Sequence, residues 1–109
     1  MVNIESRVTD DKIIVRLSGR IGGESSIEMY RELKNIINDN NNKSLILDFG
    51  KLDFIDSSGL GSLVAINSTL LKQGLTLTLA SIPDNLMDLL RVTNLDRVLN
   101  IVMKVEDED

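Results

Sequence analysis

The chain has 109 residues, a net charge of −5 and neither cysteine nor histidine, and this composition excludes several classes of function. Without these two residue types there are no disulfides, no thiolate or imidazole metal ligands, and no Ser-His-Asp or Cys-His nucleophile systems, which need imidazole as the base. The negative charge and the scarcity of aromatic residues (two Phe, one Tyr, no Trp) also argue against nucleic-acid binding.

The start of the chain predicts a β-hairpin. Residues 2–8 and 13–17 form two extended runs, and the two aspartates between them favour a turn. Ser18 and Gly19 are expected to end the second strand.

A helix is predicted next. A loop with Gly22 and Gly23 leads into it, and Ser25 or Ser26 is the expected N-cap, because a hydroxyl can accept a hydrogen bond from the first free amides. The helix is expected to end in residues 39–42, which favour turns. Its apolar stripe comprises Ile27, Tyr30, Leu33, Ile36 and Ile37.

The middle of the chain predicts a central strand, a second helix and another strand. Residues 45–49 are nearly all apolar, as in a strand covered on both faces. After Gly50, a short connection is expected to lead to the second helix, with Asp56 or Ser57 as N-cap. The alternating residues 75–80 then predict a strand with one apolar face.

The last part predicts a third helix and a final strand. Pro83 lies where a helix can begin, Asn94 is the expected left-handed cap, and residues 98–103 form the last strand. The order β-β-α-β-α-β-α-β predicts an α/β fold with a mostly parallel sheet and an antiparallel hairpin at its edge. We assign residues 1–103 to one domain and residues 104–109 to an acidic C-terminal tail.

The tail should be dispensable. Residues 106–109 are all acidic, repel one another and have no apolar spacing, so we expect them to be disordered. Their deletion should leave the melting temperature and partner binding almost unchanged. A loss of more than about 1 kcal/mol of stability, large against ordinary surface changes, would show that the tail is docked.

The segment 53–62, Asp-Phe-Ile-Asp-Ser-Ser-Gly-Leu-Gly-Ser, has more polar residues and glycines than a helix start needs. Gly59 and Gly61 each cost about 1 kcal/mol relative to Ala in a helix interior, and one residue suffices as a cap. A phosphate on Ser57 would lie near helix amides and add roughly −1.5 to −2 charge without disturbing the fold. The segment is therefore interpreted as a surface switch, the ordinary alternative being a capped helix start.

Residues 54–61, Phe-Ile-Asp-Ser-Ser-Gly-Leu-Gly, resemble the signature of the STAS-domain anti-sigma factor antagonists. The similarity extends to residues 17–19, 45–49 and 89–98, and so covers nearly the whole chain. Asn94 departs from the glycine common in that family, and the acidic end of the chain replaces a fourth amphipathic helix. The resemblance implies a STAS-like regulator that is not an enzyme and has no cofactor of its own. The lack of cysteines and of a membrane-length apolar run makes the cytoplasm the expected location.

The resemblance also implies a role for each residue of the motif. Ser57 aligns with the serine that a GHKL-type anti-sigma factor serine kinase phosphorylates. The unphosphorylated protein would bind that kinase and release the sigma factor, and a metal-dependent serine phosphatase would restore binding after phosphorylation. Neither a nucleic acid nor a membrane is an expected partner. The implied partner-binding residues are Asp56, Ser58, Gly59, Leu60 and Gly61 and, in the turn after the second strand, Gly22, Gly23 and Glu24.

Three alternatives stay open. Within the same family, the chain could be a STAS subunit of a transporter or of a sensory scaffold. A phospho-aspartate receiver domain with Asp48 as acceptor would need an acidic pair after its first strand, whereas Asp10 and Asp11 lie in a hairpin turn. A metal enzyme built on Asp48, Asp53 and Asp56 lacks an identifiable further ligand.

Overall fold

The elements follow the predicted order, and one 3-10 turn is added before the last strand. The computed structural model describes residues 1–105. Because each predicted strand and helix is present, the fold class is confirmed. The elements are β1 Val2–Val8, β2 Lys12–Ile21, α1 Glu24–Asp39, β3 Ser44–Ile55, α2 Ser57–Lys72, β4 Leu77–Ala80, α3 Asp84–Val92, the 3-10 turn η1 Leu95–Arg97 and β5 Asn100–Val102.

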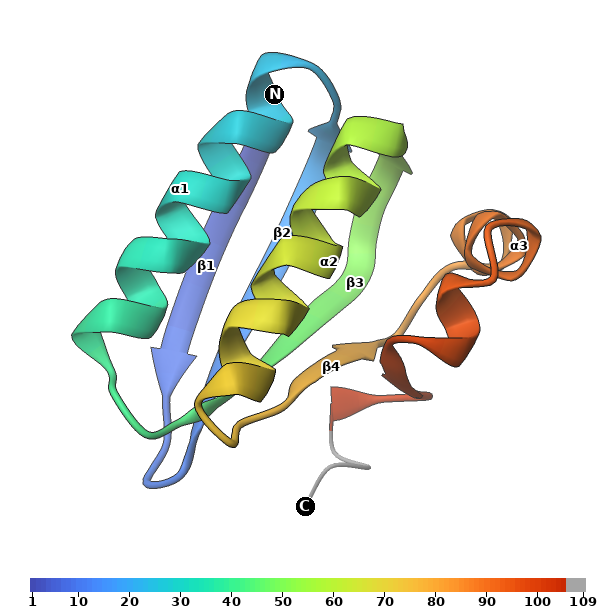
Figure 1. Cartoon of the computed structure of the whole chain (residues 1–109). Helices are drawn as coiled ribbons and strands as arrows, with labels where there is room; N and C mark the ends of the chain where they lie inside the picture. The colour runs from blue at the N-terminus through green and yellow to red at the C-terminus, as the bar shows by residue number, and fades with distance from the viewer. Residues whose placement is uncertain (106–109) are drawn as a thin grey trace.

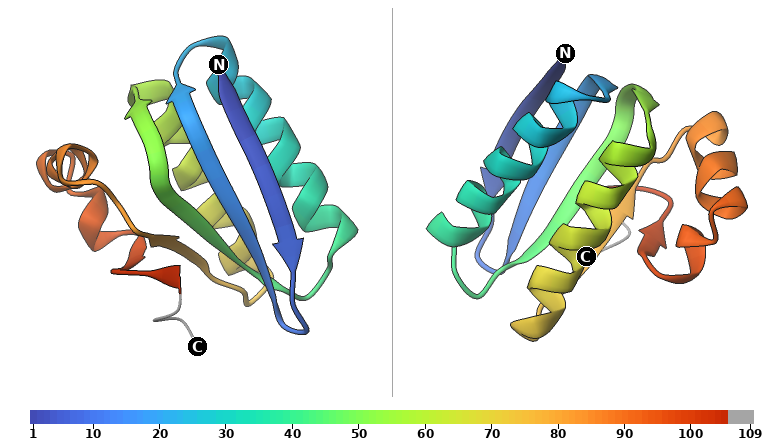
Figure 2. Two further views of the ribbon diagram at one scale, coloured as in Figure 1. Left: turned by 180° about the vertical axis from the view of Figure 1, so that it is seen from behind. Right: turned by 45° about the horizontal axis from the view of Figure 1, so that its top comes forward.

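The five strands form one sheet in the order β1-β2-β3-β4-β5. The β1–β2 pair is antiparallel and the other three pairs are parallel, as the hairpin and the crossover helices require. Helices α1 and α2 lie side by side over one face of the sheet, while α3 lies beyond β4 (Figure 1). The view from behind shows that no described helix covers the other face of β1, β2 and β3 (Figure 2).

The core is mainly aliphatic and lies largely between the sheet and helices α1 and α2, with Leu86 and Leu90 of α3 added to it. On α1 the buried apolar residues are Met29, Leu33 and Ile37, which are spaced four apart and therefore share one face. The predicted stripe was wrong for Ile27, which is 57% exposed, and it missed Met29. Other fully buried side chains include Leu17, Leu45, Leu47, Phe49, Leu63, Ile66 and Leu70.

Strands β2 and β3 are longer than predicted, and this extension positions the candidate site. β2 does not end at Ser18 and Gly19, and β3 runs through Gly50 where a connection was expected. The pair continues to Ile21 beside Ile55, across register shifts near Gly19. Gly19 has φ +90°, and a Cβ there would lie 2.6 Å from the Met1 carbonyl oxygen, so glycine is needed.

The last described elements differ in length from those predicted. β5 has three residues, whereas a strand over 98–103 was expected, because the chain is still turning at residues 98 and 99, directly after η1. Asn94 has φ +61°, which confirms the predicted left-handed cap. The acidic residues 106–109 lie outside the described residues, so the tail deletion stays a prediction. Within residues 1–105, no helix is both long and apolar enough to cross a membrane.

Candidate functional site

The candidate site lies where the carboxyl ends of β2 and β3 meet the first turn of α2. Asp56 directly follows β3, and its backbone amide donates to the Ile21 carbonyl at 3.0 Å. This bond joins the start of α2 to the last residue of β2, directly before the loop that leads to α1. Residues 22–24 and residues 56–58, which are more than 30 positions apart in the sequence, are therefore neighbours at one edge of the sheet.

The Asp56 carboxylate joins the two segments. Its Oδ1 accepts from the Ser58 hydroxyl at 2.6 Å and from the Gly59 amide at 3.0 Å, and its Oδ2 accepts from the Gly23 amide at 3.3 Å. Asp56 is thus the N-cap of α2, one of the two residues predicted for that position. The hydrogen bond from Ser58, followed by that from Gly59, lowers the pKa of Asp56 below its ordinary value.

The lowered pKa predicts how Ser58 affects acid stability. A carboxyl group whose folded pKa is depressed stabilises the fold above its unfolded pKa, and this stability is lost as the pH falls through the folded pKa. Ser58→Ala removes the strongest donor, so the pKa of Asp56 should rise and acid unfolding should begin at a higher pH. An NMR titration of the Asp56 carboxyl measures this directly, with Ser68→Ala on the exposed surface of α2 as control. An unchanged Asp56 midpoint in Ser58→Ala would contradict the prediction.

The two adjacent serines have different environments. Ser58 donates to Asp56, and its Oγ lies 3.0 Å from the Oγ of the buried Ser26. Ser57 and Ser58 are both exposed, but the Ser57 hydroxyl makes no hydrogen bond with the described residues. The Ser57 hydroxyl is therefore accessible for modification, whereas modification of Ser58 would break contacts that hold the start of α2.

The predicted N-cap of α1 was wrong. The helix begins at Glu24 after Gly23, whose φ is +53°, so Ser25 and Ser26 lie inside its first turn. The Ser25 hydroxyl oxygen instead accepts from the Gly22 amide at 2.8 Å and lies 3.1 Å from the Arg20 carbonyl, to which the hydroxyl can donate. The Ser26 hydroxyl donates to the Gly23 carbonyl at 2.8 Å, so both serines fix the conformation of the loop that faces Asp56.

The two glycines of the motif have different surroundings. A Cβ on the buried Gly59 would lie 2.6 Å from Ile55 Cγ1 and 2.9 Å from Ile21 Cγ2, so the glycine permits close packing of α2 on the strand ends. A Cβ on the exposed Gly61 would meet nothing within 4 Å. Leu60 is buried in the core. Among the predicted partner-binding residues, Gly59 and Leu60 are therefore buried and can act only through packing, whereas Gly61 is exposed and can contact a partner.

Sequence reasoning missed two residues at this edge, Arg20 and Phe54. The Arg20 guanidinium carbon lies 4.3 Å from the centre of the Phe54 ring, a cation–π contact. The two residues are register partners in the β2–β3 pair. In the sequence, Phe54 could have been noticed as an aromatic residue two positions before Asp56. Its contact with Arg20 could not have been, because it follows only from the extended pairing of β2 and β3.

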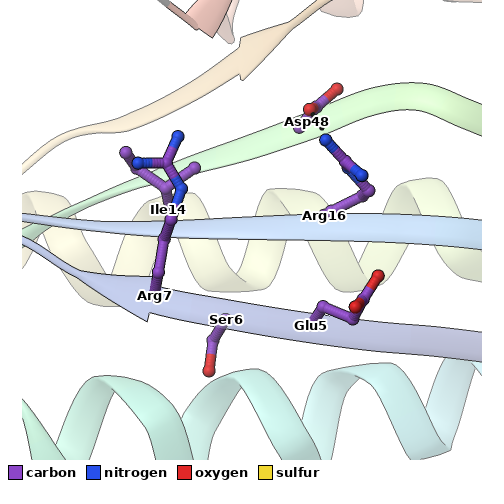
Figure 3. A pocket seen from close by; sticks show the side chains of 6 residues that line it. All are labelled: Glu5, Ser6, Arg7, Ile14, Arg16 and Asp48. Carbon is purple, nitrogen blue, oxygen red and sulfur yellow. Dashed lines mark ion pairs between the residues drawn. The ribbon is translucent and has the colours of Figure 1, made fainter.

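Asp48, the acid on which two alternative functions depend, lies elsewhere. It lines a pocket of about 270 Å³ on the sheet face away from α1 and α2 (Figure 3). Its Oδ2 is 3.6 Å from Arg16 Nε, and its Oδ1 accepts from the Gly50 amide at 2.9 Å. Within residues 1–105, no three acidic side chains come close enough together to hold a metal ion, so Asp48, Asp53 and Asp56 do not form a common centre.

Comparisons with known proteins agree with this architecture. The family model described as the STAS domain matches residues 3–108. A candidate anti-sigma factor antagonist from Thermotoga maritima is 24% identical, with a TM-score of 0.89 over 96% of this chain and 90% of that one. An anti-sigma factor antagonist from Mycobacterium paratuberculosis is 19% identical, with a TM-score of 0.87 over 98% and 90%.

A third similar structure is that of the Bacillus cell fate determinant SpoIIAA in its phosphorylated form. It is 19% identical, with a TM-score of 0.73 over 100% of this chain and 97% of that one. At these identities the three structures show a common fold.

Proposed function

The chain belongs to the STAS domain family, and on that premise we propose that it is an anti-sigma factor antagonist that is switched by phosphorylation of Ser57. The single observation that carries this proposal is the contrast between the two adjacent serines. Both serines are exposed, but the Ser57 hydroxyl has no hydrogen bond among the described residues, while the Ser58 hydroxyl is held by Asp56. The similar Bacillus protein SpoIIAA has a phosphorylated form, which supports the same kind of switch.

In the proposed cycle, the unphosphorylated protein binds a GHKL-type anti-sigma factor serine kinase and so releases a sigma factor. The kinase then uses its own ATP and Mg²⁺ to phosphorylate Ser57, which ends the binding. A metal-dependent serine phosphatase restores the active form. The protein acts as a substrate and a binding module in the cytoplasm, without a cofactor, a nucleic acid or a membrane.

The proposed partner surface consists of two segments that the Asp56 carboxylate links. The first is the exposed loop and helix start at Gly23 and Glu24, and the second is the first turns of α2 with Ser57 and Gly61. Gly23 and Gly61 present no side chain, so a partner can approach the backbone closely at both places.

The experiment that tests this function is the identification of the phosphorylated residue. After incubation with ATP and an anti-sigma factor kinase from the same genome, peptide mapping should find one phosphate per chain, on Ser57. Ser57→Ala should accept none, and Ser58→Ala should still be phosphorylated. Phosphate found mainly on Ser58, or full labelling of Ser57→Ala, would refute the assignment.

A further inference from the structure

Arg20 and Phe54 form a contact pair at the same edge of the sheet as the switch serine. β2 ends one residue after Arg20, and β3 ends one residue after Phe54. Both residues therefore lie next to residues 22–24 and 56–58, which form the candidate site. A Cβ on Gly22 would lie 3.4 Å from Phe54 Cε2 and 2.8 Å from Asp56 Oδ2. The ring and the Asp56 carboxylate thus flank the same glycine, and the pair is continuous with the proposed partner surface.

Both side chains of the pair are accessible to a partner from the solvent. Arg20 is exposed, and within residues 1–105 its guanidinium has neither an ion pair nor a hydrogen bond to a side chain or carbonyl. Phe54 is 37% exposed, although it is one of only three aromatic residues in the chain. Arg and aromatic residues, Phe among them, are enriched at protein interfaces, and Arg is enriched at the positions that dominate the binding energy.

Stacking on the ring also fixes where the guanidinium is presented. A guanidinium held over an aromatic face loses less conformational freedom on binding than a free arginine, and its planar set of N–H donors matches a carboxylate. The nearby residues of the proposed surface, Glu24 and Asp56, are both acidic. Arg20 therefore supplies the positive charge that a partner's acidic side chain would need at this edge.

We propose that Arg20 and Phe54 form a second contact region for the anti-sigma factor kinase, in which the guanidinium pairs with a carboxylate of the kinase and the exposed ring packs against an apolar neighbour of it. This inference rests on the proposed function, since it concerns the same partner. It assigns part of the affinity for the kinase to Arg20, whereas phosphorylation of Ser57 controls the release of the kinase.

The test compares variants in binding to the GHKL-type anti-sigma factor kinase that phosphorylates the wild-type chain, by titration calorimetry. Arg20→Ala should raise Kd about tenfold or more, equivalent to about 1.4 kcal/mol per tenfold, and Arg20→Glu should raise it further. Phe54→Leu should also weaken binding, because it removes the ring that holds the guanidinium. In Arg20→Ala, Kd should depend less on salt concentration than in the wild type.

Arg16→Ala is the matched control, since Arg16 is an exposed arginine of the same strand, four residues from Arg20, and paired with Asp48. It should change Kd less than twofold. Circular dichroism and melting temperatures establish that each variant is folded. If the wild type binds the kinase and Arg20→Ala binds equally well, this inference is wrong and the proposed function stands. If no anti-sigma factor kinase from the genome binds the wild type, the proposed function fails, and the inference fails with it.

Discussion

Phosphorylation of Ser57 is expected to weaken kinase binding by two to three orders of magnitude. The added phosphate lies next to the Asp56 carboxylate. That carboxylate already accepts hydrogen bonds from the Gly59 amide of the helix start and from the Gly23 amide. Kinase binding is weakened by repulsion between this added charge and an acidic side chain of the bound kinase: at an effective dielectric near 20 and about 6 Å, one such pair of like charges costs roughly 2–3 kcal/mol. A near-dianionic phosphate reaches roughly twice that before salt screening reduces it, and about 1.4 kcal/mol corresponds to a tenfold change in affinity.

Substitutions separate this charge effect from refolding. Ser57→Asp should weaken binding, but less than phosphate does because its charge is smaller, while Ser57→Ala should bind persistently. Both variants should keep the wild-type circular dichroism spectrum, because the Ser57 side chain contributes no hydrogen bond to the described structure. Equal affinities of Ser57→Asp and Ser57→Ala, or melting of α2 on phosphorylation, would show that the electrostatic explanation is wrong.

Substitution of Gly59 should have the largest effect on stability. In Gly59→Ala the new Cβ overlaps Ile55 and Ile21, whose contact atoms lie close to the backbone and cannot easily move. Overpacking of this kind costs about 1–3 kcal/mol, against a helix-propensity gain of at most about 1 kcal/mol. The net result should be a lower free energy of unfolding.

Gly61→Ala provides the control, because it brings a similar helix-propensity gain without any contact within 4 Å. It should leave the protein as stable as the wild type or more so. The difference between the two alanine variants then isolates the packing cost, and denaturant unfolding should show Gly59→Ala to be about 1–3 kcal/mol less stable than Gly61→Ala. Equal stabilities would contradict the packing role of Gly59.

Much of the fold could be predicted from local sequence patterns. Apolar periodicity and turn residues gave every strand and helix in the right order, and Asn94 gave a correct cap, because these features depend on neighbouring residues. The ends of β2 and β3 could not be predicted in this way. Gly19 and Gly50 indicate turns locally, but the pairing of the two strands carries both glycines within the sheet.

In the candidate site, too, the local features could be predicted from the sequence and the long-range contacts could not. The motif predicted Asp56 or Ser57 as the cap, and the structure shows Asp56 in that position, while the interpretation of the exposed Ser57 as a switch stays a prediction. The contact between Ser58 and Ser26, like that between Arg20 and Phe54, joins residues more than 30 positions apart. Neither contact has a local signal, because each depends on how the carboxyl ends of the strands meet.

The most direct test of the proposed function measures the release of a sigma factor. A fluorescently labelled sigma factor is bound to its anti-sigma factor kinase, and the protein is titrated into the complex while anisotropy is recorded. Unphosphorylated wild-type protein and Ser57→Ala should displace the sigma factor, whereas protein phosphorylated at Ser57 should need at least a hundredfold higher concentration. If saturating unphosphorylated protein binds the kinase without displacing the sigma factor, or if the phosphorylated form displaces it equally well, the protein is not an antagonist controlled by Ser57.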